Sequence, residues 1–136
     1  MSIARMMQQA AGGGGPRTDW DLAYAYYDPD LAWGASTLVY INKSFSVATE
    51  DTAPQDIFFK PDGTKMYMLG SAGDDVNEYD LSTAWDVSTA SYIQNFSIAA
   101  QEVTPQALFF KDDGTKMFVL GSLRDRVYTY TLGIQP

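Results

Sequence analysis

The chain has 136 residues, of which 46% are hydrophobic and 14% aromatic, the profile of one folded globular domain. Seventeen acidic and nine basic residues give a formal net charge of −8, the wrong sign for a protein that binds a phosphate backbone, so nucleic acid is excluded as a partner. The lack of Cys and His excludes disulfides, thiolate or imidazole metal sites and Ser-His-Asp or Cys-His catalysis, and no apolar run is long enough for membrane insertion.

The first 16 residues differ in composition from the rest of the chain, because they contain one charge, at Arg5, and end in four glycines and a proline. Their apolar residues recur at helical spacing, which predicts a short helix over Ser2–Ala11 with one narrow apolar face. Gln8 and Gln9 interrupt the apolar run that a signal peptide needs, so secretion by that route is not expected.

A helix this short is unstable alone in water and needs a partner surface; the alternative is a frayed terminus. We therefore predict that residues 1–19 form an N-terminal anchor and a Gly-rich hinge. The residues predicted to contact the partner are Ile3, Arg5, Met6, Met7 and Ala10.

The remainder of the chain repeats itself. The sequence PQDIFFKPDGTKMYMLGS, which begins at Pro54, recurs as PQALFFKDDGTKMFVLGS from Pro105, an offset of 51 residues. A third, partial copy, YDPDLAWGASTLVYI from Tyr27, recurs as YDLSTAWDVSTASYI from Tyr79, an offset of 52, so one residue is inserted or deleted after Ile41. A period near fifty residues is typical of propellers, solenoids and other repeat architectures.

Each full copy predicts four antiparallel strands, which in the first copy are residues 56–60, 65–69, 76–80 and 91–98. Gly63 supplies the positive φ of the first hairpin, and a long connection that carries Trp85 precedes the fourth strand. Four such strands without an intervening helix predict a β-propeller-like blade. The PDGTK hairpin and its flanks also resemble the blades of YVTN and NHL-like propeller families over residues 27–132, a resemblance that implies a fold rather than a function.

The predicted class is therefore all-β, with a repeat domain over residues 20–136 that follows the anchor. It comprises a partial blade (20–47), a blade (48–98) and an incomplete blade (99–136). Two blades cannot close a ring and leave sheet edges exposed, so we expect a homo-oligomer, with a trimer favoured. In it, a strand near Leu38–Val47 of one copy completes the blade that ends at Leu132 of the next. An additional copy of the third strand, Leu22–Asp28, competes for the position of residues 126–132.

Acidic residues near the hairpins suggest calcium, but Asp before Gly is ordinary turn chemistry, so neither a metal nor a cofactor is expected. These residues are Asp62, Asp74, Asp75, Asp112 and Asp113. A paired-carboxylate glycosidase site is not indicated either, because Asp56 and Glu78 become Ala107 and Thr129 in the second copy. We therefore predict that the chain is not an enzyme.

The opening MSIARMMQQAAGGGG resembles the N-terminal stretch of structural proteins of tailed bacteriophages, cyanophages in particular. The resemblance implies a virion location, docking on another virion protein through residues 1–16, and an outward-facing β-domain that is often trimeric. We therefore expect a tail-fibre, spike or decoration protein with a role in host attachment and a host-surface glycan as a candidate ligand. The first alternative is a soluble β-propeller module that binds a glycan or peptide, and such a module can be a fragment of a longer array. The second alternative is an enzyme with a site in the channel.

Overall fold

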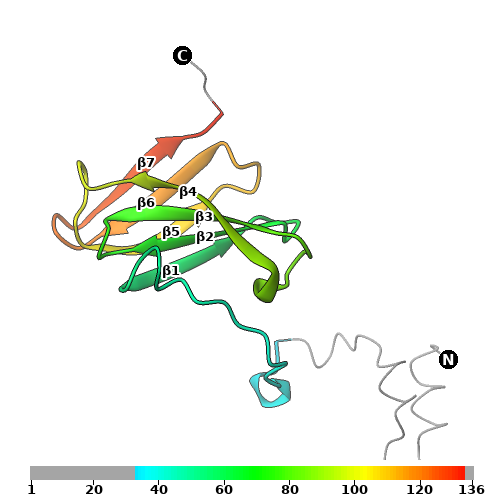
Figure 1. Ribbon diagram of the computed structural model, residues 1–136. Coiled ribbons are helices and arrows are strands. Elements are labelled where there is room, and N and C mark those ends of the chain that lie inside the picture. The colour runs from blue at the N-terminus through cyan, green and yellow to red at the C-terminus, as the bar shows by residue number, and fades with distance from the viewer. Residues whose placement is uncertain (1–32, 134–136) are drawn as a thin grey trace, which may run out of the picture. The chain divides into compact units, whose positions relative to one another are not determined.

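A computed structural model describes residues 33–133 of the chain (Figure 1). The chain divides into two compact units, Met1–Ile41 and Asn42–Pro136, and every strand in the described residues belongs to the second. Residues 33–41 of the first unit contain a short 3-10 helix, η1 (Ala35–Thr37). Over residues 33–133 no helix has the length and apolarity needed to cross a bilayer.

Sheet A contains four antiparallel strands in the order of the sequence. They are β1 (Pro54–Phe59), β2 (Lys65–Gly70), β3 (Asp75–Leu81) and β4 (Ala90–Ser97), with the 3-10 helix η2 (Val87–Thr89) before β4. The β1–β2 hairpin turns at Gly63, whose φ of 73° is the positive value that the PDGT sequence predicts. The four strands predicted for this copy are confirmed, each to within two residues.

Sheet B repeats the first three strands with the same register. It contains β5 (Pro105–Phe110), β6 (Lys116–Gly121) and β7 (Arg126–Thr131). Pro105 lies opposite Gly121 as Pro54 lies opposite Gly70, and both hairpins have a register shift after the proline. In the described part of the chain no strand pairs with the outer edge of β7, so sheet B lacks the fourth strand that sheet A has.

The two sheets pack face to face, with β1 against β5 (Figure 1). The core between them joins Leu69, Val76 and Ile98, from sheet A and the turn after it, to residues of sheet B, namely Leu108, Phe110, Met117 and Val119. Aromatic rings extend this contact, since the Phe110 centroid lies 4.4 Å from that of Tyr67. Side chains on a strand point alternately to the two faces of the sheet. The residues that sheet B contributes to this core are therefore not the repeat equivalents of those that sheet A contributes.

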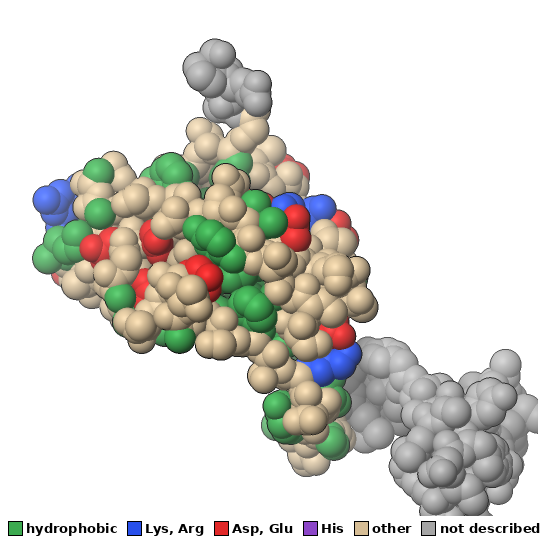
Figure 2. Space-filling view, in the orientation of Figure 1, with side chains coloured by type: hydrophobic (Ala, Val, Ile, Leu, Met, Phe, Trp, Pro, Cys, Tyr) green, Lys and Arg blue, Asp and Glu red, His purple; other side chains and the backbone are tan. Residues whose placement is uncertain are grey.

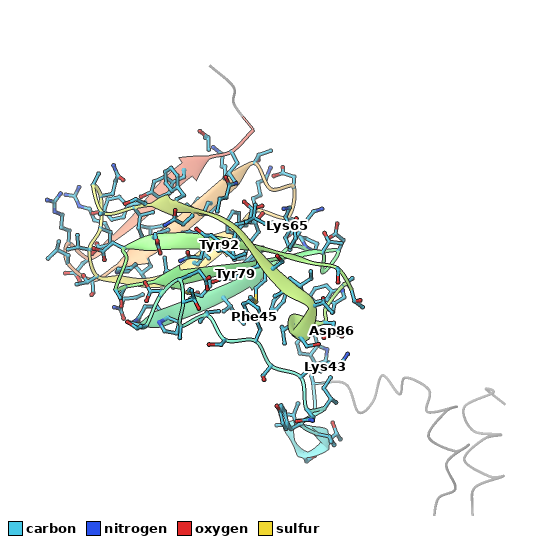
Figure 3. All side chains as sticks on the ribbon, in the orientation of Figure 1. Lys43, Phe45, Lys65, Tyr79, Asp86 and Tyr92 are labelled. Atoms are coloured by element: carbon cyan, nitrogen blue, oxygen red, sulfur yellow. The ribbon has the colours of Figure 1, made fainter. Side chains whose placement is uncertain are left out.

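The other face of sheet A is covered by the segment that precedes β1. Its core consists of Met66, Met68, Tyr79 and Leu81, against which Phe45 and Val47 pack. The Phe45 ring meets Tyr79 edge-on, with centroids 5.5 Å apart, and Lys43 forms an ion pair with Asp86 (Figure 3).

In the single chain no strand precedes Pro54 among the described residues, so residues 38–47 pair with neither sheet, and their predicted pairing with a second copy stays a prediction. A strand needs a free sheet edge for its backbone N–H and C=O groups. The edge that matches this segment, β7, belongs to the sheet on the opposite side of sheet A. The all-β prediction is confirmed, whereas the described residues form an open stack of two sheets and not a closed ring.

Candidate functional site

The predicted anchor residues lie outside the described part of the chain. They are Ile3, Arg5, Met6, Met7 and Ala10, and the predicted helix Ser2–Ala11 and the strand copy Leu22–Asp28 lie there too. The anchor, the hinge and the domain boundary at residue 19 therefore stay predictions.

The acidic hairpin residues hold the turns. Asp62 Oδ1 accepts hydrogen bonds from the Thr64 N–H (2.9 Å) and hydroxyl (2.6 Å), and Asp113 accepts the same pair from Thr115. The side chain of Lys60, together with Thr64, holds the pKa of Asp62 well below its usual range. Over residues 33–133 no three acidic side chains converge as a metal site would require. These contacts assign both aspartates to turn formation.

Two buried carboxylates, at equivalent positions of the repeat, were not singled out by the sequence. Asp51 accepts from the backbone N–H of Ala53 (2.6 Å) and Gly73 (2.8 Å), and thereby joins the turn before β1 to the β2–β3 turn. It packs directly against Gly70, where a Cβ would overlap its carboxylate. The carboxylate therefore requires the glycine, and the pair ties two turns of one sheet together.

Glu102 makes the equivalent connection in sheet B. Its Oε1 accepts from the N–H of Thr104 (2.8 Å) and of Leu123 (3.3 Å), and it packs against Gly121. Burial by itself would raise the pKa of Glu102, but the hydrogen bonds from Thr104 and Leu123 outweigh it and hold the pKa below the usual value. The sequence signal that could have identified these two carboxylates is an acidic residue and a glycine that recur at equivalent positions of both copies.

An ion-pair network lies across β2, β3 and β4. Lys65 Nζ lies 2.6 Å from Glu78 Oε1 and 2.5 Å from Asp80 Oδ1, and Gln94 donates to the other oxygen of Glu78 at 2.8 Å. The carboxylates of Asp80 and Glu78 raise the pKa of Lys65 above its usual value.

A cleft of about 260 Å³ opens between the sheets, next to this network. Tyr67 and Tyr130 line it from the two sheets, and Glu78, Gln94 and Asn95 supply polar groups. Burial, with the Glu78 carboxylate nearby, raises the pKa of the Tyr67 hydroxyl. Aromatic faces beside amide and carboxylate groups are suited to a sugar ring, which stacks on the former and hydrogen-bonds to the latter.

The outer face of sheet B exposes apolar side chains whose equivalents in sheet A are buried. Leu120 is 44% exposed and Val127 is 63% exposed, whereas the equivalent residues, Leu69 and Val76, are 0% and 4% exposed. Phe109 belongs to the same outer face and is also exposed. Apolar side chains break the polar surface in several places on the face that Figure 2 shows. The two sheets therefore differ in how far the same apolar positions are covered.

The segment Leu38–Ile41, in the other unit, is equally unusual. Its four consecutive apolar residues are each between 71% and 81% exposed. Trp33, a few residues earlier, is fully exposed. Comparison with known proteins adds no further indication of function: no protein-family model matches the chain, and no curated protein matches it significantly.

Proposed function

We propose that this chain is a non-enzymatic structural subunit whose sheets are the blades of a β-propeller-like ring formed by several copies. The observation that carries the proposal is the open outer face of sheet B, where Leu120 and Val127 are exposed although their equivalents in sheet A are buried. A face of this composition is suited to packing against another sheet.

The assembly belongs, in this proposal, to a tailed-bacteriophage virion, as a tail-fibre, spike or decoration component that takes part in host attachment. Residues 1–16 attach it to another virion protein, through the apolar helix face described above. Three copies, each with two blades, give a six-bladed ring. Several anchors on one oligomer combine their affinities, so each helix contact can be weak. The support for this part of the proposal is the N-terminal resemblance together with the open sheet face.

Incorporation into particles tests the virion role. Met6→Asp places a charge in the predicted apolar face and is expected to remove the protein from purified particles, measured by mass spectrometry of their composition. Gln8→Asp adds the same charge on the opposite face of the predicted helix and is the matched control, which should be incorporated normally. If the Met6→Asp protein is present at normal copy number, the anchor assignment is wrong.

A second function, binding of a glycan, is favoured by the cleft between the sheets. Tyr67 and Tyr130 offer aromatic faces there, and the Gln94 amide lies beside them. Titration with a panel of neutral oligosaccharides, followed by NMR chemical shifts, should perturb the cleft residues. Gln94→Ala should weaken that binding by roughly tenfold, since it removes one hydrogen-bonding group. Gln106→Ala, at an exposed position of β5, is the control, and equal effects of the two variants would refute the assignment.

A further inference from the structure

In the described residues no strand pairs with the outer edge of β7, and sheet A shows which residues pair at the equivalent edge. In sheet A, β4 pairs with β3 so that Val76 lies opposite Phe96 and Tyr79 opposite Tyr92. The equivalents of Val76 and Tyr79 are Val127 and Tyr130, in β7. The equivalents of Phe96 and Tyr92 are Phe45 and Tyr40, which lie before β1 because the repeat begins with its last strand.

Phe45 already occupies the position of a fourth-strand residue. Across the stack of sheets, Phe96 meets Tyr130 with centroids 5.6 Å apart and an interplanar angle of 78°. Phe45 meets Tyr79, the equivalent of Tyr130, with values of 5.5 Å and 75° (Figure 3). The segment therefore lies on sheet A as β4 lies on sheet B, and no sheet among residues 33–133 includes it.

Sheet B of the same copy, to which β7 belongs, cannot be the sheet that receives this segment. Phe45 and Val47 pack on the face of sheet A that carries Met66 and Met68. Sheet B, with β7, packs on the opposite face, which carries Leu69. Sheet A thus separates the segment from the β7 strand of its own copy, whereas the β7 strand of a second copy can approach it from the open side.

We propose that residues 38–46 of one copy add to β7 of a second copy as the fourth strand of its sheet B. The pairing of β3 with β4 sets the register at the start of β7, which places Phe45 opposite Val127 and Ser46 opposite Arg126. The residue inserted after Ile41 enlarges the bulge of the added strand, and beyond it Tyr40 lies opposite Tyr130. The same step lays the open face of the second copy, with Leu120 and Val127, over sheet A of the first. One contact between copies would thus pair the free backbone groups of β7 and bury the exposed apolar face.

A tryptophan supplies a separate observation that agrees with this arrangement. Trp85 packs over the β1–β2 hairpin, where its backbone N–H donates to the Gly63 carbonyl (2.9 Å) and its ring covers that glycine. At the equivalent hairpin of sheet B, no described atom lies within 4 Å of the position of a Cβ on Gly114. The repeat equivalent of Trp85 is Trp33, which has nearly the same φ, 69° against 65°, and is fully exposed.

Strand addition brings Trp33 of the first copy to the uncovered hairpin of the second, since it precedes residues 38–46 as Trp85 precedes β4. The contact is head-to-tail, so each copy uses one surface to receive and another to donate. Such contacts produce rings when the rotation closes. The inference rests on the proposed assembly of several copies, but not on a virion role or on the anchor.

Engineered cysteines test the register directly, because the chain has no cysteine of its own. Asp75 and Ser97 are the repeat equivalents of Arg126 and Ser46, and they lie opposite each other in β3 and β4. They form a non-hydrogen-bonded pair, because the flanking hydrogen bond runs from the Ile98 N–H to the Asp74 carbonyl. Such pairs hold Cα atoms about 4.5 Å apart, which a disulfide can span. Both positions to be changed are exposed, so the substitutions should not disturb the fold.

The full-length variants Ser46→Cys and Arg126→Cys are mixed and oxidised. We expect a disulfide-linked dimer that contains one copy of each, identified by mass spectrometry of the linked peptides. The control replaces Arg126→Cys with Thr129→Cys, on the same strand but with its side chain on the other face, and should give roughly tenfold less product. Equal yields from the two mixtures, or no product from either, overturn the proposed register.

Backbone pairing is tested by a proline on the free edge. Leu132 donates its N–H to Thr115, toward β6, so strand alternation turns the N–H of Thr129 outward. A proline is tolerated there in a free edge but removes a donor from an added strand. Thr129→Pro should weaken association at least roughly tenfold, measured by sedimentation, whereas Thr129→Val should not. If the unmodified chain sediments at its single-copy mass of 15.0 kDa from roughly 1 to 100 μM, the proposal fails.

Discussion

The two copies of the repeat contain leucines that differ only in what covers them. Leu69 in β2 is completely buried between the sheets, and Leu120, at the same position of β6, is 44% exposed. Truncation of each to alanine removes the same atoms from the same kind of strand. The difference between the two effects therefore measures the burial that sheet packing provides.

Leu69→Ala should reduce the free energy of unfolding by about 2–5 kcal/mol, the range for a fully buried leucine whose cavity only partly collapses. Leu120→Ala should cost no more than about 1 kcal/mol in the single copy, because about half of the side chain is in water and no closed cavity forms. For a unit of this size 1 kcal/mol corresponds to roughly 4–8 °C in Tm, so the two variants should be separated by on the order of 10 °C or more.

Thermal unfolding followed by circular dichroism, over a range of protein concentrations, provides the measurement. At low concentration only Leu69→Ala should be strongly destabilised. As copies associate, the Tm of the unmodified chain should rise, and Leu120→Ala should lose most of that increase. The reasoning is refuted if both variants lower Tm equally at low concentration, or if Leu69→Ala costs less than Leu120→Ala.

Three further predictions concern the turns and charges of the two sheets. Gly63→Ala should destabilise more than Gly114→Ala in calorimetry, because both strain a positive φ but only the first pushes a methyl group into the ring of Trp85. The fold lowers the pKa of Glu102, so the ionised carboxylate should stabilise the fold fully above the ordinary pKa of 4.5, and this stabilisation should be lost as pH falls through the lower pKa of the folded state. Glu102→Gln should therefore show a smaller loss of stability at acid pH. The fold raises the pKa of Lys65, so its contribution should be complete below the ordinary value of 10.5 and be lost as pH rises through the folded value, and Lys65→Met should show a smaller alkaline loss in the same measurement.

Much of the fold could be predicted from the sequence, because the same pattern of apolar residues and turn residues occurs in both copies of the repeat. The hairpin glycines, Gly63 and Gly114, fix where the first two strands meet, and alternating apolar residues locate the strands on either side. The long connection before the fourth strand was recognised from Trp85, which lies next to η2. Local chemistry therefore sufficed for the strands and their order.

Sequence pattern could not show which apolar face would be buried. Both faces of these strands are apolar, as Met68 and Leu69 show by lying on opposite sides of β2, each fully buried. Strand alternation then favours neither face, and the stacking of the sheets decides which residues lose water. The sequence alone also does not show that Asp51 and Glu102 are buried. That burial becomes evident only from the glycines against which they pack in the structure.

The same limit applies to residues 38–47, which were recognised as a fourth strand by their equivalence to β4. Recognition of a strand specifies its own N–H and C=O groups but not the edge that receives them. The contact of Phe45 with Tyr79 places this segment on the side of sheet A away from β7, and for this reason we propose that the sheet that receives it belongs to a second copy. Since one β7 strand cannot lie on both sides of sheet A, the pairing of residues 38–46 with the β7 strand of a second copy, as proposed above, would let this segment complete a sheet of the same kind.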